Sequence, residues 1–176
     1  MPEQSIGRVK AFWGNFGMLV RAFSYIALHG GEGLRAVTDH AVLNANYIRA
    51  GLKGIYPMPF DRICGHEFVC MGHFDEAEGI HALDISKRLM DYGIHPPTNY
   101  FPLIVPEALL IEPTETESRE ACDHFISAMK QIAQEAVESP ELLHEAPHSA
   151  PVKRVDDVRA AKQLVLCCRV LPEGEG

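Results

Sequence analysis

The chain has 176 residues, which is enough for one compact domain with a hydrophobic core and leaves little room for a second. Its 24 acidic and 16 basic residues give a net charge of -8, which argues against nucleic acid and anionic lipid surfaces as partners. The composition is 47% hydrophobic and 23% charged, with neither an apolar run of membrane-spanning length nor a signal-peptide stretch, so the sequence predicts a folded cytoplasmic protein.

Two long helices are predicted in the first part of the chain. Residues 14–29 place large apolar side chains at helical spacing, which indicates an amphipathic helix whose stripe packs in a core. The residues assigned to this core are Phe16, Met18, Leu19, Val20, Phe23 and Ile26 or Ala27. Gly30 and Gly31 should end this helix, and a second apolar stripe predicts another helix over residues 32–52.

The middle of the chain alternates between extended and helical patterns. Residues 56–60 predict a linker, because each of their prolines removes a backbone donor. Residues 63–72 have an apolar, β-prone centre between turn residues and predict a strand. Residues 81–93 return to helical spacing, with Gly93 as the C-cap.

Prolines and a capping pattern divide the next segment. Residues 94–102 hold three prolines and predict an ordered loop or extended segment, since they fit neither a regular helix nor an interior strand. Residues 107–113 predict a short strand. Thr114 and Glu117 match a capping box ahead of a helix that runs to about residue 138.

The last part of the chain predicts a short helix after Pro140, a loop at 146–151, a helix at 155–162 and a strand or extended tail at 165–171. A few short strands among several helices favour an α+β fold, in which helices cover one face of a small sheet. We expect a helical segment, residues 1–55, to lead into a carboxy-terminal α+β domain with an extended tail, residues 56–176, the two forming one compact unit.

Cys64, His66, Cys70 and His73 form the richest cluster of possible metal ligands, since Zn²⁺ selects thiolate and imidazole. On a strand, however, the first three would share one face while His73 points to the other, and no C-x-x-C pair is present. We therefore interpret them as half-buried strand residues and expect no metal site.

The chain has five cysteines, an odd number without a framework spacing, which favours reduced thiols over disulfides. They are Cys64, Cys70, Cys122, Cys167 and Cys168. A redox-sensitive pair is the alternative.

His95 is the best candidate for a ligand-facing residue, because Pro96 and Pro97 should hold its loop in a defined position. His66 and Glu67 could supply an acid and a base, but neighbouring residues on a strand point to opposite faces. A core histidine bonded to the backbone explains His66 equally well. No nucleophile elbow, metalloprotease helix or catalytic cysteine signature occurs, so the residues alone do not name a reaction.

Several long segments, in order along nearly the whole chain, resemble the carboxy-terminal part of the glycine dehydrogenases (decarboxylating), the P-proteins of the glycine cleavage system. They are GNFGMLVRAFSYI, AVLNANYIRAGLK, HEFV, DISKRLMDYGIHPPTNYFPLIVPEALLIEPTETES and LHEAPHSAPVKRVDDVRAAK. EPTETES and the stretch PPTNYFP resemble the bacterial two-subunit form in particular, where this region ends subunit 2.

The resemblance implies a fold-type I enzyme that depends on pyridoxal phosphate, with this chain as its small carboxy-terminal domain and adjoining helices. In that family glycine is decarboxylated on the cofactor, and the aminomethyl group passes to the lipoyl arm of H-protein. The implied partners are glycine, lipoylated H-protein, the other P-protein subunit and the upstream region that carries the cofactor lysine, assembled as an oligomer.

The family's cofactor lysine follows a histidine upstream of this region, and no His-Lys pair occurs here, so the isolated chain is expected to be inactive and to bind no cofactor. The family's motif positions match His66, His95 and Thr98, which we expect to border the substrate or lipoyl channel. Two alternatives stay open. One is a non-catalytic module that binds the lipoyl carrier or the partner subunit, and the other is a small metal-binding protein built on Cys64, His66 and Cys70.

Overall fold

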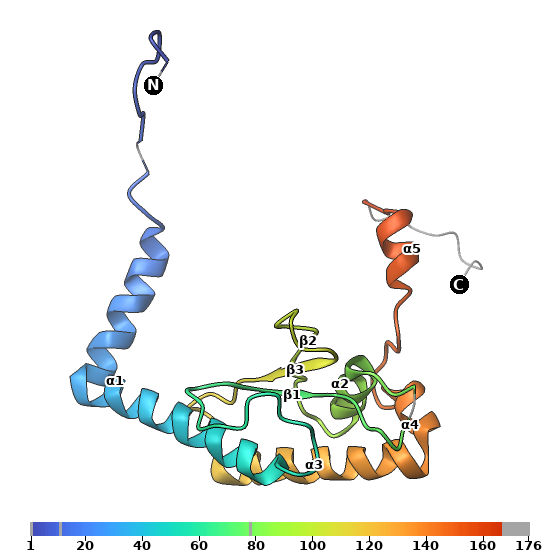
Figure 1. Ribbon diagram of the computed structural model, residues 1–176. Helices are drawn as coiled ribbons and strands as arrows, with labels where there is room; N and C mark the ends of the chain where they lie inside the picture. Colours follow the sequence, from blue (N-terminus) through green and yellow to red (C-terminus); the bar gives the residue numbers. More distant parts are fainter. Residues whose placement is uncertain (1, 11, 78, 167–176) are drawn as a thin grey trace.

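The computed structural model describes residues 2–10, 12–77 and 79–166 and has the predicted α+β architecture (Figure 1). Its elements, in chain order, are α1 (Phe16–Leu52), β1 (Phe68–Met71), α2 (Ala82–Asp91), β2 (Thr98–Asn99), β3 (Ala108–Ile111), α3 (Arg119–Glu138), α4 (Pro140–His144) and α5 (Asp157–Lys162). Within the part of the chain described, none of the helices has the length and apolar character needed to cross a membrane.

The sheet is antiparallel, with β3 between β1 and β2. Phe68 pairs with Ile111, and both side chains are buried against the helices. Leu110 pairs with Val69 on one side and with Thr98 on the other, and this row lies on the less buried face. The short β2 lies at the edge of the sheet, which is where a proline-rich segment can still form a strand. Helices therefore cover one face, as predicted.

A single apolar core joins this covered sheet face to four helices. The second half of α1, residues 31–52, contributes Ile48 and Leu52, while α3 contributes Met129 and Ile132. The helices α1 and α3 approach closely because Gly51 has no side chain: a Cβ built there would lie 2.7 Å from Cδ1 of Ile126. The sheet forms one layer. The second half of α1 and α3 form the helical layer that covers its buried face (Figure 1).

The helix α1 is kinked at Gly30, whose φ of 60° and ψ of -174° are not helical, so the predicted break between two helices is confirmed. The predicted core role of the first helix is wrong. Phe16 and Phe23 are 77% and 74% exposed, and Met18 is also exposed. The first half of α1, residues 16–29, projects away from the rest of the molecule, and no described element covers its stripe (Figure 1).

The helix α3 begins later than predicted, and the capping box at Thr114 is wrong. Its N-cap is Ser118, whose hydroxyl accepts a hydrogen bond from the backbone N–H of Ala121 at 3.2 Å. The preceding turn is held by α1 instead, because the Asn44 side chain donates to the carbonyls of Thr114 and Glu117 at 3.0 Å each. A long-range contact has displaced the local cap.

The strand predicted over 63–72 is reduced to β1, since residues 63–67 form an irregular turn. Asn46 holds this turn: its side-chain amide donates to the carbonyl of Cys64 at 2.9 Å, and its oxygen accepts from the Cys64 N–H at 3.1 Å. The predicted helix at 155–162 corresponds to α5. Of the predicted tail, residues 167–171 lie outside the described residues.

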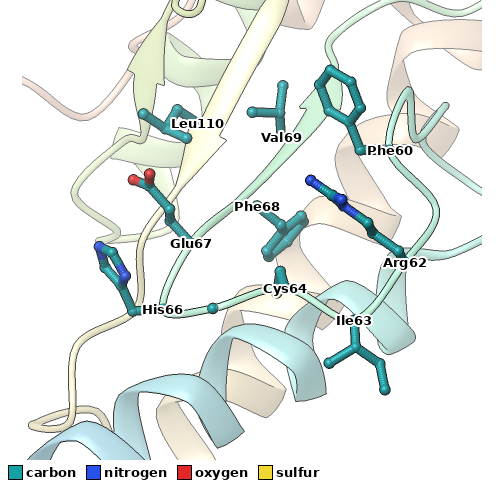
Figure 2. A pocket seen from close by; sticks show the side chains of 10 residues that line it. Phe60, Arg62, Ile63, Cys64, His66, Glu67, Phe68, Val69 and Leu110 are labelled. Carbon is teal, nitrogen blue, oxygen red and sulfur yellow. The ribbon is translucent and has the colours of Figure 1, made fainter.

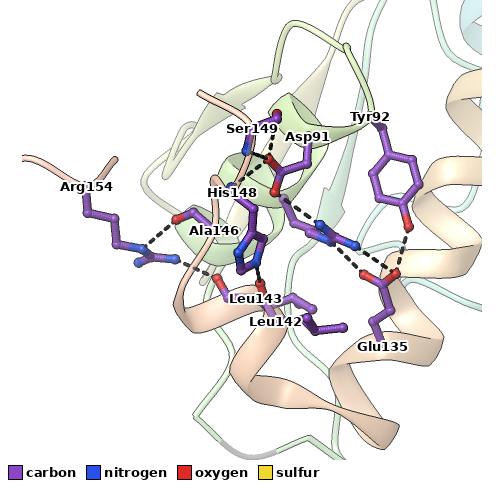
Figure 3. Close-up of polar contacts among 10 residues, drawn as sticks. Asp91, Tyr92, Glu135, Leu142, Leu143, Ala146, His148, Ser149 and Arg154 are labelled. Atoms are coloured by element: carbon purple, nitrogen blue, oxygen red, sulfur yellow. Dashed lines mark hydrogen bonds and ion pairs between the residues drawn. The ribbon is translucent and has the colours of Figure 1, made fainter. Parts of the chain in front are cut away.

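Polar contacts on α2 anchor both α3 and the carboxy-terminal stretch (Figure 3). Arg88 donates from Nε and Nη2 to the carboxylate of Glu135 on α3, at 2.8 and 3.1 Å. Asp91 accepts from the backbone N–H groups of His148 and Ser149, at 2.7 Å each. The last turn of α2 is thus bonded both to α3 and to the carboxy-terminal stretch.

Candidate functional site

Two surface cavities flank the carboxyl end of β3. The first, here called the proline groove, has a volume of about 470 Å³ and lies where the loop after α2 meets α1 and the start of α3. The residues used below that line it are His95, Pro96, Pro97, Glu112, Glu117 and His124. The second, here called the sheet-face pocket, has a volume of about 430 Å³ and borders the less buried face of the sheet (Figure 2). Its charged or titratable lining residues are Arg62, Cys64, His66 and Glu67.

His95 lies in the proline groove, on the loop that Gly93 starts by ending α2 with a φ of 73°. The backbone N–H of Ile94 donates to the Leu89 carbonyl at 3.1 Å, which fixes where the loop leaves the helix. The His95 ring is exposed, and nothing within the described residues hydrogen-bonds or ion-pairs with it. The His95 ring therefore keeps its hydrogen-bonding nitrogens available to a ligand.

His124 lies across the same groove, on the second turn of α3, and its Nε2 donates to the carbonyl of Tyr92 at 3.0 Å. Glu112 and Glu117 add two carboxylates to a lining that is otherwise mostly proline and aliphatic. The groove therefore combines apolar walls with two imidazoles and two acids.

Thr98, three residues after His95, and His66, from the turn before β1, lie near the same strand end. Thr98 starts β2 and pairs in register with Leu110, although it lines neither cavity. Nε2 of His66 lies 3.7 Å from Oε1 of Glu112, which itself lines the proline groove. The structure thus brings the three predicted residues, His95, Thr98 and His66, around the end of β3.

His66 and Glu67 both line the sheet-face pocket, so the prediction that they face opposite ways is wrong. Strict alternation applies only to a strand, and β1 begins one residue later, at Phe68. Figure 2 shows the two side chains extending from the turn beside Leu110.

The residues considered as possible metal ligands do not lie together. Cys64 lies in the turn bonded to Asn46, Cys70 is a fully buried residue of β1, and His73 pairs with Asp75 at 3.5 Å. Among the described residues, no group of three or more His, Cys, Asp or Glu side chains could hold a metal ion. The described residues therefore provide no ligand set for the alternative of a metal-binding protein.

The three described cysteines, Cys64, Cys70 and Cys122, are free thiols, and the other two lie outside the described residues. Burial raises the pKa of the Cys70 thiol to about 12. Burial and the neighbouring carboxylates of Glu117 and Asp123 also raise the pKa of Cys122, which lines the proline groove. These thiols stay protonated near neutral pH and are poor nucleophiles.

Pyridoxal phosphate, the cofactor that the family resemblance implies, is held in such enzymes by an imine to a lysine amine. Neither cavity is lined by a lysine. Lys53 is paired with Asp61 at 2.7 Å, and Lys87 is half-buried on α2. The remaining lysines are exposed; they are Lys10, Lys130, Lys153 and Lys162. The residues present do not make a complete site for this cofactor.

Glu112, Glu117 and His124 were not predicted as site residues. The two glutamates belong to the EPTETES motif, whose residues predict a strand end and a helix cap and carry part of the family resemblance. His124 lies in the groove because of how α3 packs beside the loop after α2, and no spacing within α3 predicts that contact.

Comparison with known proteins identifies relatives along most of the chain. A family model described as "Glycine dehydrogenase, C-terminal domain" matches residues 37–151, a range that includes both cavities. A probable glycine dehydrogenase (decarboxylating) subunit 2 from Bacillus velezensis is 58% identical over 163 residues, covering 93% of this chain and 33% of that protein.

Proteins of the same description from Listeria welshimeri and Lysinibacillus sphaericus are each 56% identical, over 162 and 163 residues. These matches cover 92% and 93% of this chain and 33% and 34% of the relatives. The chain thus spans about a third of the length of the curated relatives it matches. It belongs to the family of glycine dehydrogenase C-terminal domains.

Proposed function

We propose that this chain is the carboxy-terminal part of a decarboxylating glycine dehydrogenase subunit 2 and takes part in glycine decarboxylation when the rest of the enzyme completes it. The observation that carries this proposal is the identity of 56–58% over nearly the whole chain to proteins of that description. The relatives are named as subunit 2, which supports a second subunit as a partner.

We propose that the proline groove borders the path of the substrate or of the lipoyl arm, with His95, Thr98 and His66 beside it. Two observations support this. His66 comes from a different segment than His95 and Thr98 yet lies with them around the end of β3, and the His95 ring is unpaired in an open groove. The apolar walls would exclude water from a bound apolar arm, while His95 and Glu117 could orient or exchange a proton.

The proposed cofactor of the complete enzyme is pyridoxal phosphate, which would stabilise the negative charge left on the glycine carbon as carbon dioxide departs. Its lysine would come from the upstream region, because no lysine lines either cavity here. Lipoylated H-protein would accept the aminomethyl group in the cytoplasm. On this proposal the chain alone is inactive.

We also propose that residues 1–55 form a helical segment that leads into a domain of residues 56–176. Ile48 and Leu52 share the core of that domain, which supports one unit in this region. The first half of α1 makes no comparable contact within the described chain.

The test uses a chimera in which this chain replaces the matched third of the Bacillus velezensis relative, produced together with the other subunit. We expect glycine-dependent release of carbon dioxide with lipoylated H-protein, and none from this chain alone. His95→Ala should lower kcat by at least about a hundredfold, the smaller end of what removing a proton-transfer group costs. His40→Ala, an exposed histidine on α1 outside both cavities, is the matched control.

A folded, cofactor-loaded chimera without activity would contradict the proposed function. Activity that His95→Ala leaves unchanged would instead remove His95 from the site and leave the function standing. Absorption titration of the isolated chain with pyridoxal phosphate, followed by borohydride trapping, checks the cofactor separately: a saturable aldimine would contradict the assignment of the lysine to the upstream region.

A further inference from the structure

We propose that one side of this molecule, here called the docking side, packs against the polypeptide that corresponds to the other two thirds of the subunit 2 relatives. Three separate segments make this contact: the first half of α1, the connection between β2 and β3, and the stretch of residues 152–166. The inference rests on the proposed function, since it takes its partner from the same relatives. It adds which surface meets that partner.

The first half of α1 carries an apolar stripe that nothing covers. Its exposed members, at helical spacing, are Phe16, Leu19, Val20, Phe23 and Ile26. The helix projects past the body of the molecule, so this stripe lies in solvent along its whole length (Figure 1). Contiguous apolar surface of this kind is rare on free-standing proteins and marks an interaction site.

The β2–β3 connection presents a second apolar surface from an ordered loop. Leu103 and Ile104 at its tip are 86% and 81% exposed. Both ends of the loop are fixed: the N–H of Tyr100 donates to the Ala108 carbonyl at 2.8 Å, and the Glu107 carboxylate accepts from the N–H of Ala82 at 2.7 Å.

Tyr100 and Glu107 themselves have φ angles of 59° and 48°, a left-handed conformation that side-chain-bearing residues rarely adopt. Such strain persists only where surrounding contacts enforce it. The loop therefore holds its apolar tip in one position before any partner arrives, which lowers the entropic cost of docking.

The third surface lies on the carboxy-terminal stretch, where Val152, Val155 and Val158 are exposed. Its base is anchored: Arg154 Nη2 lies 2.7 Å from the buried Asp84 carboxylate and donates to the Leu143 carbonyl at 2.8 Å. Polar contacts thus fix the direction of the stretch, and its valines face outward. In Figure 1 the stretch rises on the same side as the first half of α1 and the β2–β3 connection.

The opposite side of the molecule has a different surface chemistry. The outer face of α3 is dominated by polar and charged residues, including Asp123, Ser127, Lys130, Gln134 and Glu138. That is the composition of a face exposed to water. The outer face of α3 thus lacks an apolar stripe like that of the first half of α1, although single apolar residues outside the docking side, such as Ile63 and Val137, are exposed.

The length and coverage of the relatives identify the partner. The first half of α1 and residues 152–166 lie outside the matched domain of residues 37–151. The match to the Bacillus velezensis relative nevertheless spans 93% of this chain, so most of both segments has a counterpart there. Two thirds of that relative remain to cover them, and a covalently linked surface competes at a high effective concentration against a second copy of this chain.

The experiment measures the accessibility of single cysteines to a maleimide, site by site, by peptide mass. Leu19→Cys and Leu103→Cys probe the docking side, and Lys130→Cys on α3 is the matched control. Each substitution is placed in the isolated chain at submicromolar concentration and in the chimera with the Bacillus velezensis relative. In the chimera we expect labelling at positions 19 and 103 to slow at least about tenfold, while position 130 is unchanged.

Equal labelling rates at positions 19 and 103 in the chimera and the isolated chain would overturn the inference. Protection of both positions in the isolated chain, to the degree seen in the chimera, would also overturn it, because a second copy would then be the partner. Where the fusion is insoluble, the upstream polypeptide added in trans gives the same readout. A chimera that is protected but inactive contradicts the proposed function alone, and an active but unprotected chimera contradicts the docking alone.

Discussion

The helix α3 and the first half of α1 carry the same kind of sequence pattern and have opposite surroundings. In α3 the apolar stripe includes Met129 and Ile132, and both are fully buried. In the first half of α1 the stripe includes Phe16 and Phe23, and both are largely exposed. The difference lies in the neighbours: α3 packs on α1, α2 and α4, whereas the first half of α1 extends beyond them (Figure 1). A periodic pattern identifies the face of a helix that needs cover, and it does not identify what covers it.

The largest expected effect tests that difference directly. Ile132→Ala in the isolated chain should lower the free energy of unfolding by about 3 kcal/mol, because it leaves a cavity in the core. Phe23→Ala removes a larger side chain yet should change the same quantity by less than about 0.5 kcal/mol, as at an ordinary surface site. Urea denaturation followed by circular dichroism measures both. Similar losses would mean that the first half of α1 is covered after all.

The next largest effect tests whether Arg154 anchors the carboxy-terminal stretch to the buried part of the molecule. Arg154→Ala leaves the buried Asp84 carboxylate without its closest cation, and we expect a loss of about 2 kcal/mol in unfolding free energy, less than for a fully buried pair. Lys153→Ala changes the adjacent exposed residue and should have almost no effect. Equal stability of the two variants would show that the stretch is not anchored by this pair.

Two glycines in α1 differ in how closely other residues pack against them. At Gly51 a Cβ would meet Ile126 at 2.7 Å, whereas nothing lies within 4 Å of one at Gly31. Gly51→Ala should therefore destabilise the chain by about 1 kcal/mol through overpacking. Gly31→Ala should stabilise it by up to about 1 kcal/mol through helix propensity.

The double variant Gly51→Ala with Ile126→Val removes the clashing methyl group and should recover part of the loss. Thermal unfolding of the single and double variants gives the coupling between the two sites. Additive changes would rule out the proposed contact.

The smallest effect concerns pH. Burial alone would raise the pKa of Glu135, but hydrogen bonds from Arg88 and Tyr92 outweigh it, and the pKa is lowered. A carboxyl group with a lowered folded-state pKa contributes stability above its unfolded pKa of about 4.3, and this contribution is lost as the pH falls through the folded value. Glu135→Gln should therefore flatten the loss of unfolding free energy below about pH 4.5. Glu76→Gln, on an exposed loop, should leave that pH dependence unchanged.

Much of the fold could be predicted because its signals are local. The break at Gly30 and the end of α2 before Gly93 occur where glycine allows a positive φ, and α4 starts at Pro140, whose fixed φ suits the first position of a helix. The two errors at element boundaries have the opposite origin. Asn46 holds the turn before β1, and Asn44 holds the turn before α3, so contacts from a distant helix decided both.

The candidate site could be predicted only in part, for the same reason. His95 was found because its prolines restrain the loop locally, and the structure places it in a groove. The position of Glu112 and His124 in the same groove as His95 cannot be predicted from the sequence. It depends on how β3, α3 and the loop after α2 pack together. No spacing within a single segment carries that information.

The helix α2 connects the carboxy-terminal stretch to the loop of His95. Asp84 and Asp91 lie about two helical turns apart and hold Arg154 and the backbone at Ser149, so the carboxy-terminal stretch is fastened to one rigid rod at two points. The loop of His95 leaves the end of the same rod. A substitution that displaces α2 should therefore change two places at once. It would alter the width of the proline groove at the loop of His95, and it would move the carboxy-terminal stretch bonded to Asp84 and Asp91.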